Sequence, residues 1–244
     1  ICNPDPKTYS NYYSVMEDEN RNIHKVCLYF THMKEYSAYI FDFDNTLVDS
    51  SHGLEVALRA GFREFGIPYD PKKLPVYMRT PLRDTWEKYK PNCPCKFRDF
   101  FELVIVTYDR CYLDEVQLFP DAKECIEVLS SKGKDLGVVS NSLSIHINSI
   151  LDRLNVRDSF GSIVGADRCM NGKPSPEPVR LCLQELGQDA EDAVMIGDAK
   201  NDILSGKAAG TDTVLIDRDD LKVCDEETVR VKDLRDILTP YRRC

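Results

Sequence analysis

The sequence predicts an α/β fold, in which helices cover both faces of a doubly wound parallel sheet. From residue 119 to residue 216, short apolar runs typical of buried strands alternate with helical segments. An all-helical stretch, residues 50–118, is inserted after the first strand. Polar residues stand at the ends of the predicted strands, where sheets of this kind bind ligands. We therefore expect an α/β core, a helical insert, and a site at the carboxyl edge of the sheet.

The composition suits a folded protein and argues against two classes of partner. The 244 residues are 42% hydrophobic, which is enough for a substantial core. The formal charge of −9 argues against nucleic acid, because proteins that bind it usually present a basic patch. No apolar run approaches the ~18 residues that a membrane-spanning helix requires, so we expect no membrane contact. The sequence leaves the oligomeric state, monomer or homodimer, open.

The ten cysteines predict free thiols in a reducing compartment. Their spacing forms no compact disulfide framework, and Cys93-Pro-Cys95 is the single close pair. A metal site at that pair stays open, but no second Cys or His pair stands at zinc-finger spacing. The N-terminus carries no secretory signal, which favours a cytoplasmic location.

Residues 1–32 are polar and mixed, and we expect them to form a poorly ordered N-terminal extension. A short apolar patch, Val26–Phe30, leaves an alternative open. In that alternative a strand or helix packs on the core through Val26, Leu28 and Phe30.

The first strand of the core is predicted at Tyr39, Ile40 and Phe41, an apolar, β-prone run. Asp42 and Asp44 follow at its end, and alternation along the strand would turn both carboxylates to one side. Two carboxylates close together repel each other, which raises the pKa of one of them. Such a pair suits chemistry in which one carboxylate attacks phosphorus while the other moves a proton. Read alone, an acidic turn after a strand explains the same residues.

Helical periodicity marks three segments of the insert, Gly53–Phe65, Pro81–Tyr89 and Lys96–Leu113. Gly66-Ile-Pro ends the first of them. A helical layer packed on the sheet is enough to explain this pattern.

The rest of the core is predicted as alternating helices and strands. The helices are expected at Ala122–Lys132, Ser144–Leu154, Pro176–Leu186 and Asn201–Ala209. The strands are expected at Leu136–Ser140, Ser162–Ala166, Ala193–Gly197 and Thr213–Ile216. Ser175 is the expected N-cap of the third helix, with Pro176 at its first position.

Several residues near these strand ends could contribute to a phosphate and metal site. Ser140 and Asn141 offer a hydroxyl and backbone N–H groups to a phosphate oxygen, although Ser-Asn is also common in turns. Lys173 stands between a strand and a helix, and read alone it would be a surface charge. Asp198 and Asp202 are spaced so that both can project into one site, as hard oxygen ligands for Mg²⁺ require.

Four motifs, in order along the chain, resemble those of the haloacid dehalogenase-like phosphohydrolases. They are Tyr39-Ile-Phe-Asp-Phe-Asp-Asn-Thr-Leu-Val-Asp-Ser50, Ser140 at a strand end, Gly172-Lys-Pro-Ser-Pro-Glu-Pro178, and Val194-Met-Ile-Gly-Asp-Ala-Lys-Asn-Asp202. The resemblance extends from residue 39 to about residue 216. It implies a Rossmann-like core of residues 33–49 and 119–244, with a helical cap of residues 50–118 that closes over the active site.

The resemblance also implies a division of chemical roles. Asp42 would be the nucleophile that forms an aspartyl-phosphate, and Asp44 would protonate the leaving oxygen and then activate water. Mg²⁺ would be held by Asp42, the backbone carbonyl of Asp44, Asp198 and, directly or through water, Asp202. Lys173 would neutralise the crowded carboxylates and the phosphoryl group.

These roles describe a Mg²⁺-dependent phosphatase acting on a small phosphorylated metabolite, whose phosphate Ser140, Asn141 and Lys173 would bind. Asp44 indicates a phosphate ester rather than a haloacid as the substrate, because the dehalogenase branch of the family lacks this second acidic residue. The alternative from another class is a non-catalytic family member that binds a phosphorylated ligand or a protein. The intact set of acidic residues and lysine disfavours that alternative.

The substrate stays open among phosphoglycolate-like esters, sugar phosphates and nucleotides. Asp-Ser-x-x-Gly-Leu at 49–54 and the turn from Arg79 to Arg83 resemble phosphoglycolate phosphatases, although these usually carry Gly near Arg79. A β-phosphoglucomutase-like phosphotransferase is disfavoured. Leu54 stands where such enzymes carry a catalytic His, two positions after His52. Arg79 and Arg83 could contact a substrate carboxylate or second phosphate, or they are surface arginines.

Overall fold

The computed structural model describes residues 13–17, 23–27, 34–90, 95–220 and 224–238. The chain divides into two compact units, Ile1–Lys34 with Pro240–Cys244, and Glu35–Thr239. In the first unit, β1 (Tyr13–Glu17) and β2 (Ile23–Cys27) form an antiparallel pair. The side chain of Val26, and all of Leu28 and Phe30, lie outside the described part of the chain, so the two alternatives for residues 1–32 stay predictions.

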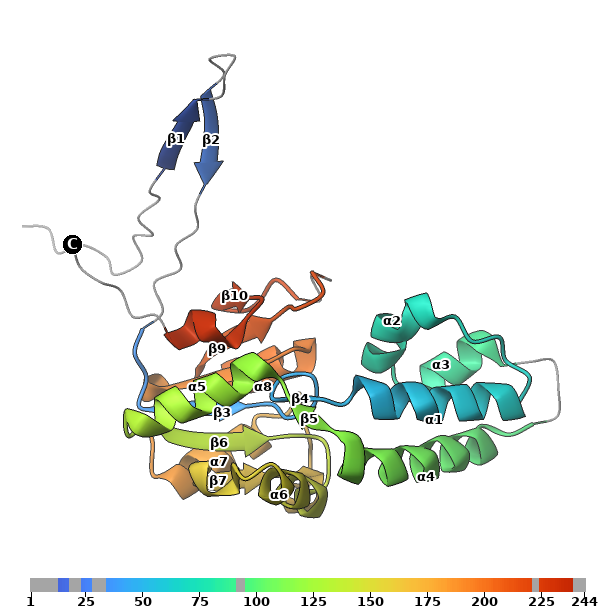
Figure 1. Ribbon diagram of the computed structural model, residues 1–244. Helices are drawn as coiled ribbons and strands as arrows, with labels where there is room; N and C mark the ends of the chain where they lie inside the picture. The colour runs from blue at the N-terminus through green and yellow to red at the C-terminus, as the bar shows by residue number, and fades with distance from the viewer. Residues whose placement is uncertain (1–12, 18–22, 28–33, 91–94, 221–223, 239–244) are drawn as a thin grey trace, which may run out of the picture. The chain divides into compact units, whose positions relative to one another are not determined.

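The second unit is built on a six-stranded sheet with the order β10-β9-β8-β3-β6-β7 (Figure 1). All five neighbouring pairs in it are parallel. The strands are β3 (Ala38–Phe41), β6 (Asp135–Val139), β7 (Ser162–Val164), β8 (Ala193–Gly197), β9 (Asp212–Ile216) and β10 (Val229–Val231). The predicted doubly wound α/β fold is therefore confirmed, and β10 is a strand that the sequence did not indicate.

Helices cover both faces of this sheet, which explains why its central strands are apolar along their whole length. They are α5 (Pro120–Ser131), α6 (Ser144–Arg153), α7 (Glu177–Leu186) and α8 (Lys200–Ala209). Figure 1 shows α5 in front of the sheet and α7 and α8 behind it. On the α7 side, Ile40, Val139 and Met195 form one buried cluster with Val179 and Cys182 of that helix.

The start of α7 differs by one residue from its prediction. Pro176 is the N-cap and the helix begins at Glu177. The Ser175 hydroxyl nevertheless accepts a hydrogen bond from the Glu177 N–H at 3.2 Å. The short 3₁₀ segments are Pro71–Lys73, Arg157–Ser159, Ala166–Arg168, Ala190–Asp192 and Leu234–Leu238.

A helical insert leaves the sheet through β4 (Val48–Asp49) and returns through β5 (Gln117–Leu118), and these two strands form an antiparallel pair. Between them lie α1 (Ser51–Glu64), α2 (Leu74–Arg79), α3 (Leu82–Tyr89) and α4 (Phe97–Glu115). The three helices that periodicity indicated are present. The sequence did not indicate α2, β4 or β5.

Aromatic side chains hold the insert together. Phe62 of α1, Trp86 of α3 and Phe100 of α4 are buried in one cluster. The Trp86 and Phe100 rings lie 5.0 Å apart between centroids, and the Phe62 and Phe100 rings lie 6.0 Å apart. The insert therefore has an apolar core of its own.

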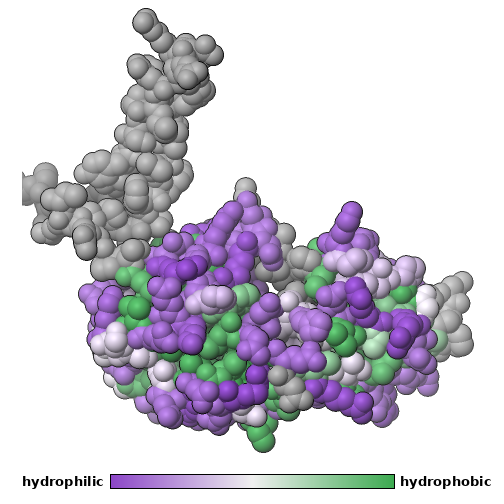
Figure 2. Space-filling model, in the orientation of Figure 1, coloured by the Kyte–Doolittle hydropathy of each residue, from purple (hydrophilic) through white to green (hydrophobic). Residues whose placement is uncertain are grey.

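The face of the described residues seen in Figure 2 is largely hydrophilic, with apolar residues in patches between the polar ones. No helix among the described residues is long and apolar enough to cross a membrane. Of the described cysteines, Cys111, Cys125, Cys169, Cys182 and Cys224 are free thiols, as expected. Cys95 is disulfide-bonded, so the prediction of a free thiol is wrong there, and Cys93 lies outside the described residues.

Candidate active site

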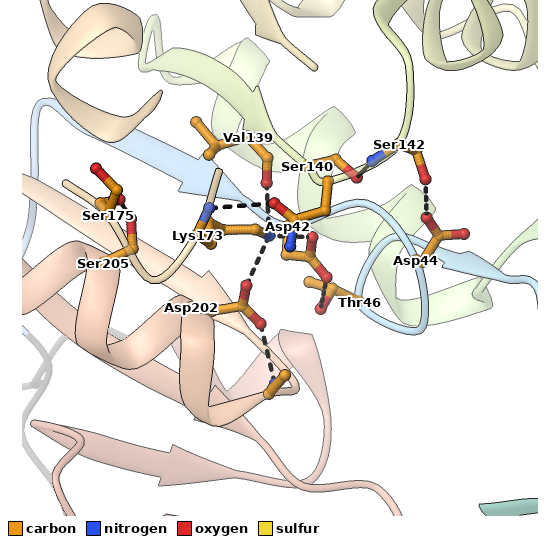
Figure 3. Close-up of polar contacts among 12 residues, drawn as sticks. Asp42, Asp44, Thr46, Val139, Ser140, Ser142, Lys173, Ser175, Asp202 and Ser205 are labelled. Carbon is orange, nitrogen blue, oxygen red and sulfur yellow. Dashed lines mark hydrogen bonds and ion pairs between the residues drawn. The ribbon is translucent and has the colours of Figure 1, made fainter. Parts of the chain in front are cut away.

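Most of the predicted site residues, among them Asp42, Ser140 and Lys173, gather at the carboxyl edge of the sheet around β3 (Figure 3). The register pairs Phe41, the last residue of β3, with Val138 of β6 and with Ile196 of β8. The three strands therefore end within one residue of one another. The chain winds from β3 to β6 and β7 on one side and then crosses to β8 on the other. Such a change of direction is where doubly wound sheets leave room for a ligand.

Three carboxylates form the centre of this site. Oxygen atoms of Asp42, Asp198 and Asp202 all lie within 4.8 Å of one another, and all three residues are buried. Asp202 reaches the group from the first turn of α8, where its second oxygen accepts the Ala199 N–H at 2.9 Å. Gly197 makes this approach possible, because a Cβ at that position would lie 2.4 Å from the Asp202 carboxylate.

Lys173 enters the same group from the loop before α7. Its Nζ lies 2.5 Å from Asp42 Oδ1, 2.6 Å from Asp202 Oδ1 and 2.9 Å from the carbonyl oxygen of Val139. The Asn141 side-chain oxygen accepts the backbone N–H of Lys173 at 3.1 Å. Asn141 is exposed. Its hydrogen bond to the Lys173 backbone holds the loop that carries this lysine against the end of β6.

The electrostatics of the group favour a divalent cation. Burial raises the pKa of Asp42 well above its usual range, and the Asp202 and Asp198 carboxylates add to this against the opposing effect of Lys173. Burial lowers the pKa of Lys173, but Asp202 and Asp42 more than reverse this and hold it above its usual range. Three carboxylates face one ammonium group here. The excess negative charge and the all-oxygen donor set match what a hard metal ion requires.

Asp44 lies outside this group of carboxylates and has partners of its own. Tyr112 donates its hydroxyl to Asp44 Oδ1 at 2.9 Å, and Ser142 donates its hydroxyl to Asp44 Oδ2 at 2.8 Å. Figure 3 shows its carboxylate directed toward Ser142 rather than toward Lys173. Strand alternation does not extend to this residue, because β3 ends at Phe41 and a turn with Asn45 at φ 59° follows.

Ser140 is buried at the end of β6, beside Asp42 in Figure 3. Its hydroxyl oxygen accepts the N–H of Ser142 at 3.0 Å. Thr46 is a further site residue, because its hydroxyl lies 3.5 Å from Asp42 Oδ2 and is buried. The sequence did not identify Thr46, Ser142 and Tyr112 as site residues. Thr46 lies inside the first motif and Ser142 follows Ser140 by two residues, which is the signal that could have identified them.

The two candidate specificity residues of the insert are not brought to this site by any described contact. The side chain of Arg79, the last residue of α2, lies outside the described part of the chain. Arg83 is exposed on α3, and its guanidinium carbon lies 4.4 Å from the centre of the Phe97 ring. A cation–π contact within the insert therefore holds Arg83 in this structure.

Comparison with known proteins gives a consistent result. The family model described as haloacid dehalogenase-like hydrolase matches residues 39–216. A phosphoglycolate phosphatase from Aquifex aeolicus is 36% identical over 181 residues, which are 72% of this chain and 82% of that protein. The pyrophosphatase PpaX from Oceanobacillus iheyensis is 27% identical over 82% of this chain and 94% of its own length.

A solved structure shares the fold. The crystal structure of a predicted phosphoglycolate phosphatase from Haemophilus somnus superposes with a TM-score of 0.73 at 22% identity. The match covers 84% of this chain and 98% of that one.

Proposed function

The chain belongs to the haloacid dehalogenase-like hydrolases, and we propose that it is a Mg²⁺-dependent phosphatase of a small phosphorylated metabolite. The observation that carries this proposal is the contact of Asp42 with Lys173 at 2.5 Å, inside a buried group of three carboxylates. A carboxylate in that position is a nucleophile for phosphorus, and the lysine offsets charge on the transferring group.

The reaction would proceed in two steps. An Asp42 carboxylate oxygen forms a bond to phosphorus while the bond from phosphorus to the leaving oxygen breaks, and the proton of the Asp44 carboxyl group passes to that oxygen. Asp44 then accepts a proton from water, whose oxygen attacks phosphorus. The bond between phosphorus and Asp42 breaks, which releases inorganic phosphate and restores the Asp42 carboxylate and the protonated Asp44 carboxyl group.

The residues present fit a divalent cation, and we assign it as Mg²⁺. Asp42, Asp198 and the backbone carbonyl of Asp44 would hold it, with Asp202 as a direct or water-mediated supporter. When bound, the ion would supply positive charge to the phosphoryl oxygens. Asp202 also contacts Lys173 at 2.6 Å, so this residue would orient the lysine as well.

The remaining assignments follow from position. Ser140 and Asn141 would bind the substrate phosphate with Lys173, since they stand at the end of β6 beside it. Residues 50–118 would act as a cap over a core of residues 33–49 and 119–244. Arg79 and Arg83 would contribute to substrate choice, and Arg83 would have to leave the Phe97 ring to do so. A cytoplasmic location and a monomeric or homodimeric state remain predictions.

Among substrates we place phosphoglycolate-like esters first, because the Aquifex aeolicus relative carries that activity in its name. Purified protein would be assayed with 2-phosphoglycolate, pyrophosphate, glycerol 3-phosphate, β-glucose 1-phosphate and a nucleoside monophosphate, each with Mg²⁺ and with EDTA. We expect Mg²⁺-dependent release of phosphate, fastest from 2-phosphoglycolate, and none from Asp42→Asn.

Two results would contradict the proposal. Isomerisation of β-glucose 1-phosphate without phosphate release would identify a phosphotransferase of the β-phosphoglucomutase type. Binding of these esters without turnover of any of them would support the non-catalytic alternative.

A further inference from the structure

Asp44, the proposed proton donor, is held by two hydroxyl groups from different parts of the fold. Tyr112 lies near the end of α4 in the insert, and Ser142 lies in the turn after β6 in the core. Each donates to a different oxygen of Asp44, at 2.9 and 2.8 Å. One donor on each oxygen fixes the direction and the plane of the carboxyl group, which a single hydrogen bond would not do.

Burial and ring packing fix the Tyr112 hydroxyl in its position beside Asp44. Its side chain is 1% exposed, and its ring stacks on that of Tyr108 with 4.7 Å between centroids. Its phenolic O–H is the donor of the hydrogen bond to Asp44, whose carboxylate oxygen accepts it at 2.9 Å. Packing of the ring therefore presents a fixed O–H group to Asp44.

Ser142 connects Asp44 to the phosphate side of the site. Its backbone N–H donates to the Ser140 hydroxyl at 3.0 Å, while its own hydroxyl donates to Asp44. The same short turn thus sets the relative positions of the proposed phosphate ligand and the proposed proton donor.

We propose that Tyr112, together with Ser142, is a positioning residue that directs the Asp44 carboxyl group at the leaving oxygen of the substrate. This inference rests on the proposed function. In-line transfer puts the leaving oxygen on the far side of phosphorus from the attacking Asp42 oxygen. Asp44 is turned away from Lys173 toward Ser142 (Figure 3). Its other oxygen accepts from Tyr112 of the insert, and we infer that the leaving group departs on this side. The insert would then contribute to catalysis through Tyr112, apart from any part in substrate choice.

The chemistry gives a selective test. An aliphatic leaving oxygen must take the Asp44 proton as its bond to phosphorus breaks, whereas p-nitrophenolate is stable enough to leave without it. Misplacing Asp44 should therefore harm the first kind of ester more than the second. The parameter to measure is kcat/KM, since it reports the steps up to departure of the leaving group.

The variants are Tyr112→Phe and Ser142→Ala, assayed on 2-phosphoglycolate, glycerol 3-phosphate and p-nitrophenyl phosphate. Phenylalanine keeps the stacked ring and removes only the hydroxyl. Of the two aliphatic esters, the one that the wild type hydrolyses faster is used for the comparison. We expect kcat/KM for this ester to fall about tenfold in each variant, the scale of losing one hydrogen bond to a charged group. On p-nitrophenyl phosphate we expect a decrease of no more than about twofold. Tyr89→Phe, a matched change elsewhere in the insert, should lower neither rate.

The outcomes separate this inference from the proposed function. Equal losses on both kinds of ester, no loss, or a gain on the aliphatic ester would overturn the positioning role while leaving the phosphatase assignment intact. Wild-type protein that hydrolyses neither aliphatic ester would overturn the positioning role for these substrates, and wild-type protein that hydrolyses no compound of the panel would overturn the proposed function as well. Thermal unfolding of each variant in the presence of Mg²⁺ shows whether the variant is folded. If Tyr112→Phe fails to fold, the Ser142→Ala result decides in the same way.

Discussion

Asp42 is the residue at which the requirements of the proposed reaction lower the stability of the fold. The residue is 6% exposed and shares its surroundings with Asp198 and Asp202, and its pKa is raised because burial and these neighbours disfavour the charged form. Lys173 offsets only part of this cost. The metal-free protein should therefore be less stable than it would be with one carboxylate fewer.

We predict that Asp42→Asn lowers turnover by about three orders of magnitude or more, because a neutral amide is a poor nucleophile for phosphorus. The same change should raise the free energy of unfolding in EDTA, because it removes a buried carboxylate whose charged form its surroundings disfavour. Phosphate release and urea unfolding measure the two effects. The wild type should gain more stability from Mg²⁺ than the variant does, since it keeps one more carboxylate for the ion.

Retention of near-native turnover by Asp42→Asn would exclude the covalent mechanism. Equal stabilisation of both proteins by Mg²⁺ would instead show that Asp42 is not a ligand of the ion.

At this scale the sequence predicted some contacts and missed others for a clear reason. Asp42 and Lys173 were found because each stands in a recognisable motif, Asp42 just after β3 and Lys173 in the loop before α7, and chain topology then brings them together. Tyr112 lies in the segment Lys96–Leu113, whose periodicity predicts a helix and nothing more about this residue. Its contact with Asp44 depends on where α4 packs, which periodicity along one helix cannot give.

Among the elements, the connection between core and insert depends on Arg218, which follows β9. Its guanidinium lies 2.7 Å from Asp121, donates to the carbonyl oxygen of Thr46 at 3.1 Å, and covers the Phe119 ring at 4.0 Å from its centre. Asp121 is almost fully buried, with a side-chain exposure of 4%. Arg218 therefore joins the two chain segments that flank the insert.

We predict that Arg218→Ala lowers the free energy of unfolding by about 2–3 kcal/mol, because it leaves a buried carboxylate without its cation. The measurement is the shift of the urea midpoint at an unchanged slope. Arg218→Lys keeps the charge but not the planar fork, so it should recover only part of the loss. A change below about 0.5 kcal/mol would mean that the backbone N–H groups of Ala122 and Leu234 satisfy Asp121 alone.

Close packing of α1 on α4 gives a second prediction for the elements. A Cβ at Gly61 would lie 2.7 Å from Val104 and 2.9 Å from Phe100, both buried, whereas one at Gly53 would lie 3.6 Å from Cys111 and Tyr108. Gly61→Ala should therefore destabilise the protein by about 1–3 kcal/mol despite its better helix propensity. Gly53→Ala on the same helix is the control and should be neutral or stabilising by up to about 1 kcal/mol. Similar unfolding midpoints for the two variants would show that the insert relaxes around the added methyl group.

The elements that the sequence missed are short or depend on distant partners. β4 and β5 contain two residues each and exist through their pairing with one another. β10 contains three residues and adds to β9 at the edge of the sheet. α2, with Pro75 in its first turn, is too short for a helical period to stand out. The longer strands and helices were predictable because burial repeats along them.

For the whole molecule, the division into two compact units separates residues 1–34 from every proposed site residue. Asp42, Lys173, Asp198, Asp202 and the insert all belong to the unit Glu35–Thr239. This unit contains the complete six-stranded sheet and the helices that cover it.

We therefore predict that a chain of residues 33–244 keeps kcat/KM within about twofold of the full chain, because the nucleophile, the metal ligands and the insert are all retained. Phosphate release from the best substrate of the panel gives the comparison, with thermal unfolding of both chains beside it. A matched pair with Asp42→Asn in each chain excludes a contaminating phosphatase. A truncated chain that is folded but inactive would place a catalytic contribution before residue 33. Loss of the folded protein would instead support the alternative in which Val26, Leu28 and Phe30 pack on the core.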